Sequence, residues 1–522
     1  MKKETGYSAL KFHMKSHMDL YFLAFLVGIF SGAVAVAYRA SLSLAEIFRR
    51  DVYTYARENF GIGVFLGLVV GGVIISLILG WIIVKIPMVK GSGIPQVKGI
   101  IARQMDFNWV KELGAKFFGG VLAIVAGMSL GREGPSVQLG AEVGSGIFSI
   151  FKRKEYEKKY LVTCGASAGL AAAFGAPIAG TVFAIEELHK FMSPLLVTCV
   201  LIASVSAEFV SKYFFGFSPS FNIHVDEFYQ LNHYMLIIVL AVIITFIGKL
   251  FSDGIFYFQK LYKNIKMNPM IKPVIVVGIT IVVGIFLFDI TGGGHGLAER
   301  IIHESFTYKT LFILLVGKFL FTLICYATGI PGGIFLPMLV IGAIIGKIYG
   351  MVVIDMFHLT SNYDVYFIIL GMATLLTTVV KSPLTGTVLI LEMTGSFYHF
   401  FPVVTACMTT FLISELIGIK PIYDLLLENM LPKEQETKGD NENKVIIKVP
   451  VGPDSEFDNT YIKDIVWPGT CRCLIVEIER GDRGVTPHGS TKILSGDLLV
   501  ILMDEENANK FTHTLIKMGE GI

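Results

Sequence analysis

Apolar segments of two kinds alternate along most of this chain, from about Leu20 to about Ile417. Some are long enough to cross a bilayer as one helix, such as Gly63 to Val84 and Tyr234 to Phe258. Others are short and interrupted by Gly or Pro, such as Ser136 to Phe151 and Ile334 to Gly350. Helices can break at membrane depth only where protein or a water-filled cavity satisfies the freed backbone groups. The pattern therefore predicts an all-α polytopic membrane protein with broken helices, as in transporters.

The composition supports this class and excludes others. Charged residues make up 16% of the chain, against about 25% in an average soluble domain. That is too little charge for a soluble enzyme of this size or for a disordered chain. The net charge of +2 gives no reason to expect a nucleic-acid partner. The sequence shows no Cys/His cluster and no hydrolase or Walker motif, so we expect no metal, no cofactor and no enzymatic activity, with the lipid bilayer as surroundings.

Polar segments divide the chain into four parts. Residues 1–18 form a basic N-terminal tail, and residues 19–431 hold the apolar segments. Residues 432–443, PKEQETKGDNEN, are charged and polar, which is typical of a linker. Residues 444–522 predict a small β-rich domain. Its expected strands are Val445–Val449, Cys473–Ile478 and Leu498–Leu502, with turns at Gly481–Gly484 and Ser495–Asp497.

Basic residues predict the orientation in the membrane. Four lysines lie in the N-terminal tail, and five basic residues lie in the loop from Phe151 to Tyr160. Such segments tend to stay in the cytoplasm. We therefore expect a multi-pass protein of the cell membrane with both termini cytoplasmic.

The apolar region contains an internal repeat. Ala115–Phe118 matches Gly317–Leu320, and Ala176–Glu186 matches Ser382–Glu392, each about 200 positions later in the chain. Two matches in the same order indicate two homologous halves, with a site at their interface near the middle of the membrane. The repeat alone leaves open whether the halves are parallel or inverted.

Three Gly- and Pro-rich segments each precede an apolar helical stretch, namely Gly91–Pro95, Gly131–Pro135 and Gly329–Pro337. Proline suits the first turn of a helix, and glycine lets neighbouring amides turn towards one point. A helix N-terminus carries free N–H groups and the positive end of the helix dipole, so it binds anions. Three such helix starts predict a site for a dehydrated anion that must bind and also leave.

Two glutamates break the symmetry of the repeat. Apolar residues stand at the positions that match Glu133 and Glu187, whereas Glu186 is matched by Glu392. We therefore expect the matched pair to support the fold and the unmatched acids to handle protons. For Glu187 the alternative is a solvated helix end.

Glu133 would lie inside the membrane among helix amides that favour its charged form. A carboxylate there mimics an anion and can be displaced by one or neutralised by a proton. We expect it to point away from the neighbouring Arg132; the alternative is an ion pair between the two.

These motifs resemble those of the ClC chloride channels and chloride/proton antiporters. The resemblance covers nearly the whole membrane region and rests on GSGIPQ, GREGPSVQLG, GIPGGIFLP and KPIY. It implies two inverted-repeat halves, and a homodimer with one pathway in each subunit for chloride and protons. The motif residues that it brings to the site are Gly91, Gly93, Ile94, Pro95, Gly131, Arg132, Gly134, Pro135, Gly332, Gly333 and Pro337.

The resemblance also implies how the anion is held. The hydroxyl groups of Ser92 and Tyr423 coordinate it, together with the backbone amides of Ile334 and Phe335. A serine at position 92 implies a preference for chloride, although not against every other anion.

Two acids are assigned by the resemblance to proton handling. Glu133 is the gating glutamate that competes with the anion, and Glu187 is the inner proton acceptor of the antiporter branch. Together they favour an antiporter, with a passive, voltage- or ligand-gated chloride channel as the alternative. Gln96 and Lys98 depart from many bacterial relatives, which carry acids there; we expect both to lie beyond the anion site and to alter local electrostatics.

The C-terminal segment resembles the C-terminal subdomain of regulators of potassium conductance, the TrkA-C type. The matching residues include Pro468, Arg480, Pro487–Thr491 and Ser495–Val500. The resemblance implies a small α/β domain that dimerises or senses a ligand, with a signalling nucleotide as the leading candidate. Arg480 and His488 are the candidate ligand residues; the alternative is a purely structural dimer clamp.

Overall fold

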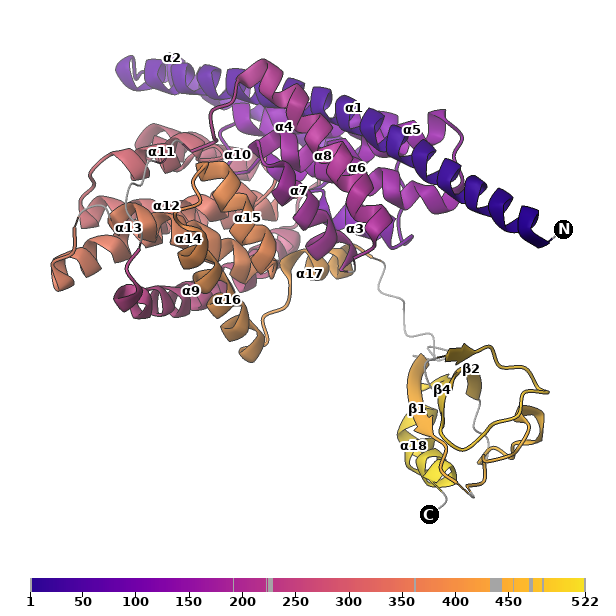
Figure 1. The fold of residues 1–522 in the computed structure, drawn as a ribbon. Helices are drawn as coiled ribbons and strands as arrows, with labels where there is room; N and C mark the ends of the chain where they lie inside the picture. Colours follow the sequence, from indigo (N-terminus) through magenta and orange to yellow (C-terminus); the bar gives the residue numbers. More distant parts are fainter. Residues whose placement is uncertain are drawn as a thin grey trace. The chain divides into compact units, whose positions relative to one another are not determined.

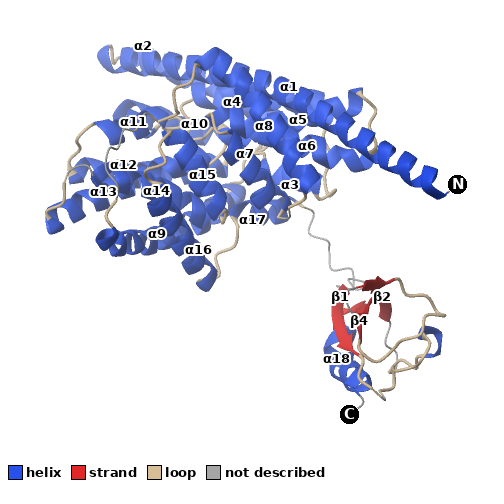
Figure 2. Cartoon of the chain, in the orientation of Figure 1, coloured by secondary structure: helices blue, strands red, loops and turns tan. Residues whose placement is uncertain are grey.

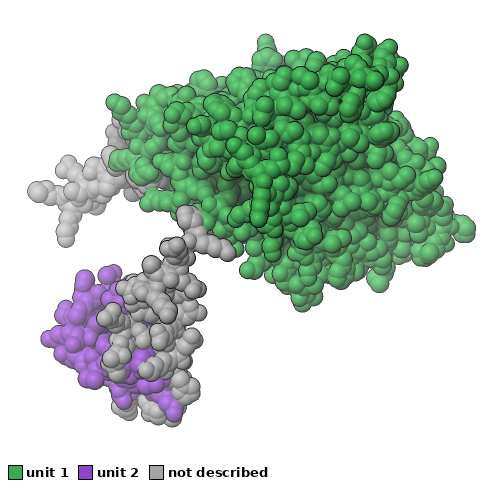
Figure 3. Space-filling model, turned by 180° about the vertical axis from the view of Figure 1, so that it is seen from behind, with its two compact units in different colours: residues 1–431 green, residues 432–522 purple. Residues whose placement is uncertain are grey.

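The computed structural model describes residues 2–190, 192–221, 223, 229–360, 363–431, 444–453, 455–468, 473–480 and 483–520. The chain forms two compact units, Met1–Leu431 and Pro432–Ile522 (Figure 3). The boundary agrees with the expected start of the linker, whose residues 432–443 lie outside the described ones.

The larger unit is helical in its described residues, as Figures 1 and 2 show. Its first half comprises α1 (Lys2–Glu58), α2 (Ile62–Lys85), α3 (Ile94–Ile101), α4 (Trp109–Val125), α5 (Glu133–Ile150), α6 (Glu155–Phe174), α7 (Pro177–Phe183), the π-helical segment η2 (Ala184–His189) and α8 (Pro194–Phe215). Its second half comprises α9 (Tyr234–Asn264), α10 (Pro273–Phe286), η4 (Phe288–Ile290), α11 (His295–His303), α12 (Tyr308–Ala327), α13 (Phe335–Phe357), α14 (Tyr363–Val380), α15 (Pro383–Thr394), α16 (Phe400–Leu416) and α17 (Ile422–Met430).

Helices long enough to span a membrane and short helices both occur, as expected. Seven helices among the described residues are long and apolar enough to cross a membrane, and α2 and α9 are two of them. The short helices α3 and α7 lie between them in the chain, and α17 follows the last of them. One expectation was wrong in detail: α13 does not end near Gly350 but continues to Phe357 and is itself long enough to span. Its glycines do not break it because they pack against neighbouring backbone instead.

Those glycines mark the same packing in both halves. A Cβ added to Gly140 on α5 would lie 2.0 Å from the carbonyl oxygen of Gly165 on α6. The matching pair in the second half is Gly342 on α13 and Gly371 on α14, where the distance is 2.3 Å. Small residues thus let each helix pair approach backbone to backbone.

The halves also contact each other reciprocally. The carboxylate of Glu186, on η2, accepts hydrogen bonds from backbone N–H groups at the start of α15, and Glu392, on α15, does the same at the start of α7. The donors are Leu384 at 3.1 Å and Thr385 at 2.7 Å for Glu186, and Ile178 at 3.1 Å and Ala179 at 2.7 Å for Glu392. Each acid satisfies N–H groups that a helix leaves free. Contacts reciprocated in this way require an approximate two-fold axis between the halves, so the expected supporting role of this pair agrees with the structure.

We predict that Glu186→Gln and Glu392→Gln destabilise the helical unit to a similar extent. Each change replaces a charged cap by a neutral one, at a cost of about 1 kcal/mol. Thermal unfolding in detergent should show two similar decreases in melting temperature. A loss confined to one of the two variants would contradict the symmetric role.

The smaller unit contains an antiparallel four-stranded sheet in the order β1-β4-β2-β3. Its strands are β1 (Lys444–Pro450), β2 (Cys473–Arg480), β3 (Arg483–Val485) and β4 (Asp497–Asp504), and α18 (Glu505–Glu520) follows them. Val449, Ile478, Leu499 and Leu515 belong to its separate apolar core. The three expected strands are confirmed, and so is the turn at Ser495 and Gly496. The expected turn after β2 lies partly at residues 481–482, outside the described ones.

Candidate functional site

Backbone hydrogen bonds join the three glycine-rich segments to one another. Gly91 donates its N–H to the carbonyl of Gly329 at 3.0 Å, and Gly332 donates to the carbonyl of Gly91 at 3.0 Å. Gly131 and Gly333, which occupy matching positions of the repeat, exchange two bonds of 2.6 and 2.7 Å. Segments that are far apart in the sequence thus meet at one place between the two halves.

Each segment leads into a helix there. The helix α3 follows Gly93, α5 begins at Glu133, and α13 begins at Phe335. Gly93 has a φ of +97°, and a Cβ on it would lie 2.5 Å from Gln138 Oε1, so this turn requires glycine. The first N–H groups of a helix have no acceptor within it. The amides of Ile334 and Phe335 lie at such a helix start, that of α13.

Two hydroxyl groups are buried beside these helix starts. Ser92 packs on the start of α5, since a Cβ on Gly134 would lie 2.3 Å from its Oγ. Tyr423, on α17, is 0% exposed and interacts with Ser92. Among the described residues neither hydroxyl has a hydrogen-bond partner of ordinary geometry. Since buried polar groups are rarely left unpaired, this arrangement fits a ligand that accepts hydrogen bonds.

Glu133 is fully buried at the start of α5. Both of its carboxylate oxygens lack a partner of ordinary hydrogen-bond geometry within the described part of the chain. Contrary to expectation, Arg132 does not point away: its Nε lies 3.7 Å from Glu133 Oε1. Arg132 already has helical dihedral angles at the N-cap position, and its side chain can therefore lie alongside the next residue. The contact is therefore an ion pair, which the sequence analysis gave as the alternative, but it is longer than a hydrogen bond.

Glu187 lies on η2 and is 2% exposed. Its Oε1 is 2.7 Å from Nζ of Lys98, and its Oε2 accepts a hydrogen bond of 3.1 Å from Ser382. Lys98 also forms an ion pair with Asp424 on α17. We expected Lys98 only to alter local electrostatics beyond the anion site, and the direct contact was missed. A lysine on a short helix next to an apolar spanning segment, and an acid directly after Tyr423, were the available signals, since charges at membrane depth need partners.

Tyr423 connects the two acids. Its phenolic hydroxyl group interacts electrostatically with both Glu133 and Glu187. Both carboxylates, one at the start of α5 and one on η2, thus act on the hydroxyl group that lies beside Ser92.

Two fully buried lysines hold the loops behind this site. Lys116 Nζ donates to the carbonyls of Val89 and Gly91 at 3.0 and 2.7 Å. Lys318, at the matching position of the repeat, donates to the carbonyls of Ile290 and Gly292 at 3.1 and 2.7 Å. Each lysine thereby fixes the backbone of one loop that borders the site.

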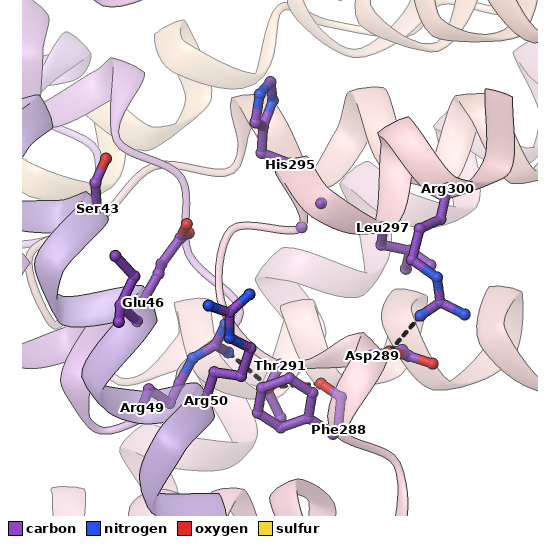
Figure 4. Close-up of a pocket in the computed structure, with 13 residues that line it drawn as sticks. Ser43, Glu46, Arg49, Arg50, Phe288, Asp289, Thr291, His295, Leu297 and Arg300 are labelled. Atoms are coloured by element: carbon purple, nitrogen blue, oxygen red, sulfur yellow. Dashed lines mark hydrogen bonds and ion pairs between the residues drawn. The ribbon is translucent and has the colours of Figure 1, made fainter. Parts of the chain in front are cut away.

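A cavity of about 400 Å³ opens between α1 and the segment that leads into α11 (Figure 4). Arg49 and Arg50 line it from α1, and Arg49 Nη1 donates to Thr291 Oγ1 at 2.6 Å. Glu46, which also lines it, interacts electrostatically with Glu133. The sequence analysis had not singled out the arginines of this cavity.

In the smaller unit, Arg480 is held by Asp497. Its Nε and Nη2 each lie 2.7 Å from a carboxylate oxygen of Asp497, and Nη2 also donates to the carbonyl of Lys492. These contacts favour a structural role for Arg480. His488 is exposed in the loop before β4.

We predict that the fold of this unit weakens in acid. Burial alone would raise the pKa of Asp497, but hydrogen bonds from Arg480 and from the N–H of Leu494 hold it below its usual 3.8. The stabilisation is therefore complete above about pH 4 and is lost as the pH falls through the lowered folded pKa. Arg480→Met should cost roughly 1–3 kcal/mol, since it leaves a buried carboxylate while its own head group is partly exposed. Adding Asp497→Asn to Arg480→Met should restore part of the lost free energy of unfolding, measured by chemical denaturation. If the double variant instead lost the sum of the two single losses, the pairing would be contradicted.

Comparison with protein families identifies two regions. Residues 75–415 match the model of the voltage gated chloride channel family. Residues 446–515 match the TrkA-C domain.

Curated proteins and solved structures agree with this. The H(+)/Cl(-) exchange transporter ClcA of Salmonella agona is 30% identical over 442 residues, which cover 82% of this chain and 92% of the relative. The ClcA of Klebsiella pneumoniae is 31% identical over 433 residues, or 81% and 91% of the two chains. The crystal structure of a slow cyanobacterial Cl⁻/H⁺ antiporter superposes with a TM-score of 0.75 at 28% identity, over 80% of this chain and 98% of the other. A CLC-type fluoride/proton antiporter, at 21% identity and a TM-score of 0.66, covers 76% of this chain and 96% of its own and shares the fold.

Proposed function

Since this chain belongs to the voltage gated chloride channel family, we propose that it is a secondary active transporter that exchanges chloride for protons across a membrane. The observation that carries the proposal is the presence of two buried acids, Glu133 and Glu187, that both act electrostatically on Tyr423 beside Ser92. A passive channel needs one gate, whereas coupled exchange needs a second group that passes protons past the anion. The second acid and the relatives named as exchangers favour antiport over a channel.

In the proposed mechanism the anion and the Glu133 carboxylate compete for the same helix amides. An ionised Glu133 takes the place of an anion at the start of α5. A proton neutralises it, weakens its hold on the amides and lets an anion replace it. Each proton taken up by Glu133 thus permits anion movement, which couples the two fluxes.

Glu187 supplies the proton from the other side. It is the acid of η2 whose oxygens contact the side chains of Lys98 and Ser382 rather than the backbone N–H groups of a helix. Its neighbour Glu186 is bound to α15 and is unsuited to exchange protons. Ser92, Tyr423 and the amides of Ile334 and Phe335 hold the anion between the two acids.

The proposal is tested with purified protein in sealed vesicles. An imposed chloride gradient should drive protons against their own gradient, measured with a pH electrode alongside a chloride electrode. Chloride movement without uphill proton movement would identify a channel.

The membrane orientation and assembly complete the proposal. The chain is a multi-pass membrane protein; we propose that residues 1–18 and the C-terminal domain face the cytoplasm and that two copies form a dimer. The basic tail and the basic residues around Arg153 support this orientation. Chemical crosslinking in native membranes tests the dimer, and the accessibility of an introduced cysteine tests the side on which the tail lies.

We also propose that the TrkA-C domain, residues 444–522, regulates transport by binding a ligand, with a signalling nucleotide as the candidate class. The match to the TrkA-C family supports a regulatory role, and an exposed His488 is the better placed of the two candidate ligand residues. Calorimetry of the full-length protein against adenine and guanine nucleotides tests it. Equal heats for the full chain and for a chain ending at Leu431 would leave only the structural dimer clamp.

A further inference from the structure

One ammonium group lies between two carboxylates from different helices on the inner side of the proposed pathway. Lys98, on α3, places Nζ 2.7 Å from Glu187 Oε1 and also contacts Asp424, on α17. Lys98 is 7% exposed and Glu187 is 2% exposed, while Asp424 is partly exposed. Water screens buried charges poorly, so this contact acts strongly on Glu187.

Each of the other polar and charged groups around Glu187 in the described residues has a contact of its own. Ser382 donates to Oε2, Tyr423 faces it from α17, and Lys190, just after η2, forms an ion pair with Asp424. On η2 itself, Glu186 is bound to the start of α15, and His189 pairs with Thr163 of α6, beside Lys159. Lys98 is therefore the cation in direct contact with Glu187, and Asp424 is the anion that shares it.

We propose that Lys98 is a positioning residue that sets the pH range in which Glu187 takes up and releases its proton, and that Asp424 opposes it by sharing the ammonium group. This inference rests on the proposed role of Glu187 as inner proton acceptor. An acid whose proton binding is influenced by two opposed neighbours can be adjusted in either direction.

The two neighbours act on Glu187 with opposite signs. A cation in contact favours the ionised carboxylate, so Lys98 keeps Glu187 charged to lower pH. Asp424 repels the Glu187 charge and draws the same ammonium towards itself, so it favours the protonated form. Asp424 is the residue after Tyr423 on α17. The effect of Asp424 on Glu187 therefore depends on the position of α17, which carries a proposed ligand of the anion.

The test compares Lys98→Met, Lys98→Arg and Asp424→Asn with the wild type in vesicles. The pH is kept equal on both faces, so random insertion of the protein does not matter, and chloride-driven proton movement is measured across a pH series. We expect the midpoint to rise by about one pH unit in Lys98→Met and to fall in Asp424→Asn. Lys98→Arg, which keeps the charge, should stay close to the wild type.

Infrared spectroscopy gives a second readout that does not depend on transport. The carboxyl band that disappears in Glu187→Gln belongs to Glu187. The pH midpoint of this band should rise in Lys98→Met and fall in Asp424→Asn. If the midpoints stay fixed while melting temperature and both fluxes fall together, the network is only structural and the inference is wrong. Shifts in the same direction for both variants would equally overturn it. A wild type that moves no protons refutes the proposed function, whereas the infrared titration still decides the inference. If Lys98→Met does not fold, Lys98→Gln and Asp424→Asn carry the same comparison.

Discussion

Glu133→Ala is expected to abolish proton movement while chloride still crosses the membrane. The variant removes the buried carboxylate at the start of α5, which in the proposed mechanism competes with the anion for the helix amides. Without that carboxylate the anion has no competitor, and no proton is needed to release it. Proton flux should fall by about 10²-fold or more, the usual cost of losing a positioned proton-transfer group, down to the background of protein-free vesicles.

The same variant should lose the pH dependence of chloride flux. In the proposed mechanism, acid protonates Glu133 in the wild type and speeds anion movement. In Glu133→Ala the chloride rate should be flat across the pH range in which the protein stays folded. The matched control is Glu155→Ala, which removes an exposed acid at the start of α6 and should keep both fluxes. Retained coupling in Glu133→Ala would show that another group gates the anion.

Glu187→Gln is the second large effect, and it separates proton supply from anion gating. Glutamine has the same shape and can still accept the hydrogen bond from Ser382, so the fold of η2 should be kept. It cannot carry a proton, and we expect proton flux to fall by about 10²-fold. Chloride flux should continue and, unlike in Glu133→Ala, should keep its pH dependence, because the gate at the start of α5 is intact.

The neighbouring residue is the control for this variant. Glu186→Gln alters an adjacent acid of η2, but that acid binds the N-terminus of α15. It should lower the melting temperature and preserve the ratio of chloride to protons. If Glu187→Gln and Glu186→Gln impaired coupling equally, a general disturbance of η2 would explain both, and the specific role of Glu187 would be refuted.

Much of the fold was predictable because its signals are local. Glycine and proline at the helix starts, and an apolar helical stretch after each, need no long-range information, and α3, α5 and α13 begin where these signals lie. The repeat added one long-range relation, and the reciprocal caps of Glu186 and Glu392 follow it.

The contacts between side chains could not be derived in this way. Lys98 and Asp424 are more than 300 positions apart, and only the folded backbone brings them to Glu187. The distance of Arg132 from Glu133 depends on the dihedral angles at one N-cap residue, which the sequence pattern does not specify. In the smaller unit the strands were predictable from alternation, but the pairing of Arg480 with Asp497 depends on the register of β2 against β4.

The reversal potential tests coupled exchange most directly. Vesicles carry a fixed chloride gradient, and the membrane potential at which chloride flux stops is measured with and without an added pH gradient. We expect the reversal potential to move when only the pH gradient is changed, because each chloride movement is tied to protons. A potential that stays at the chloride equilibrium value at every pH gradient would contradict the account and identify a passive chloride pathway.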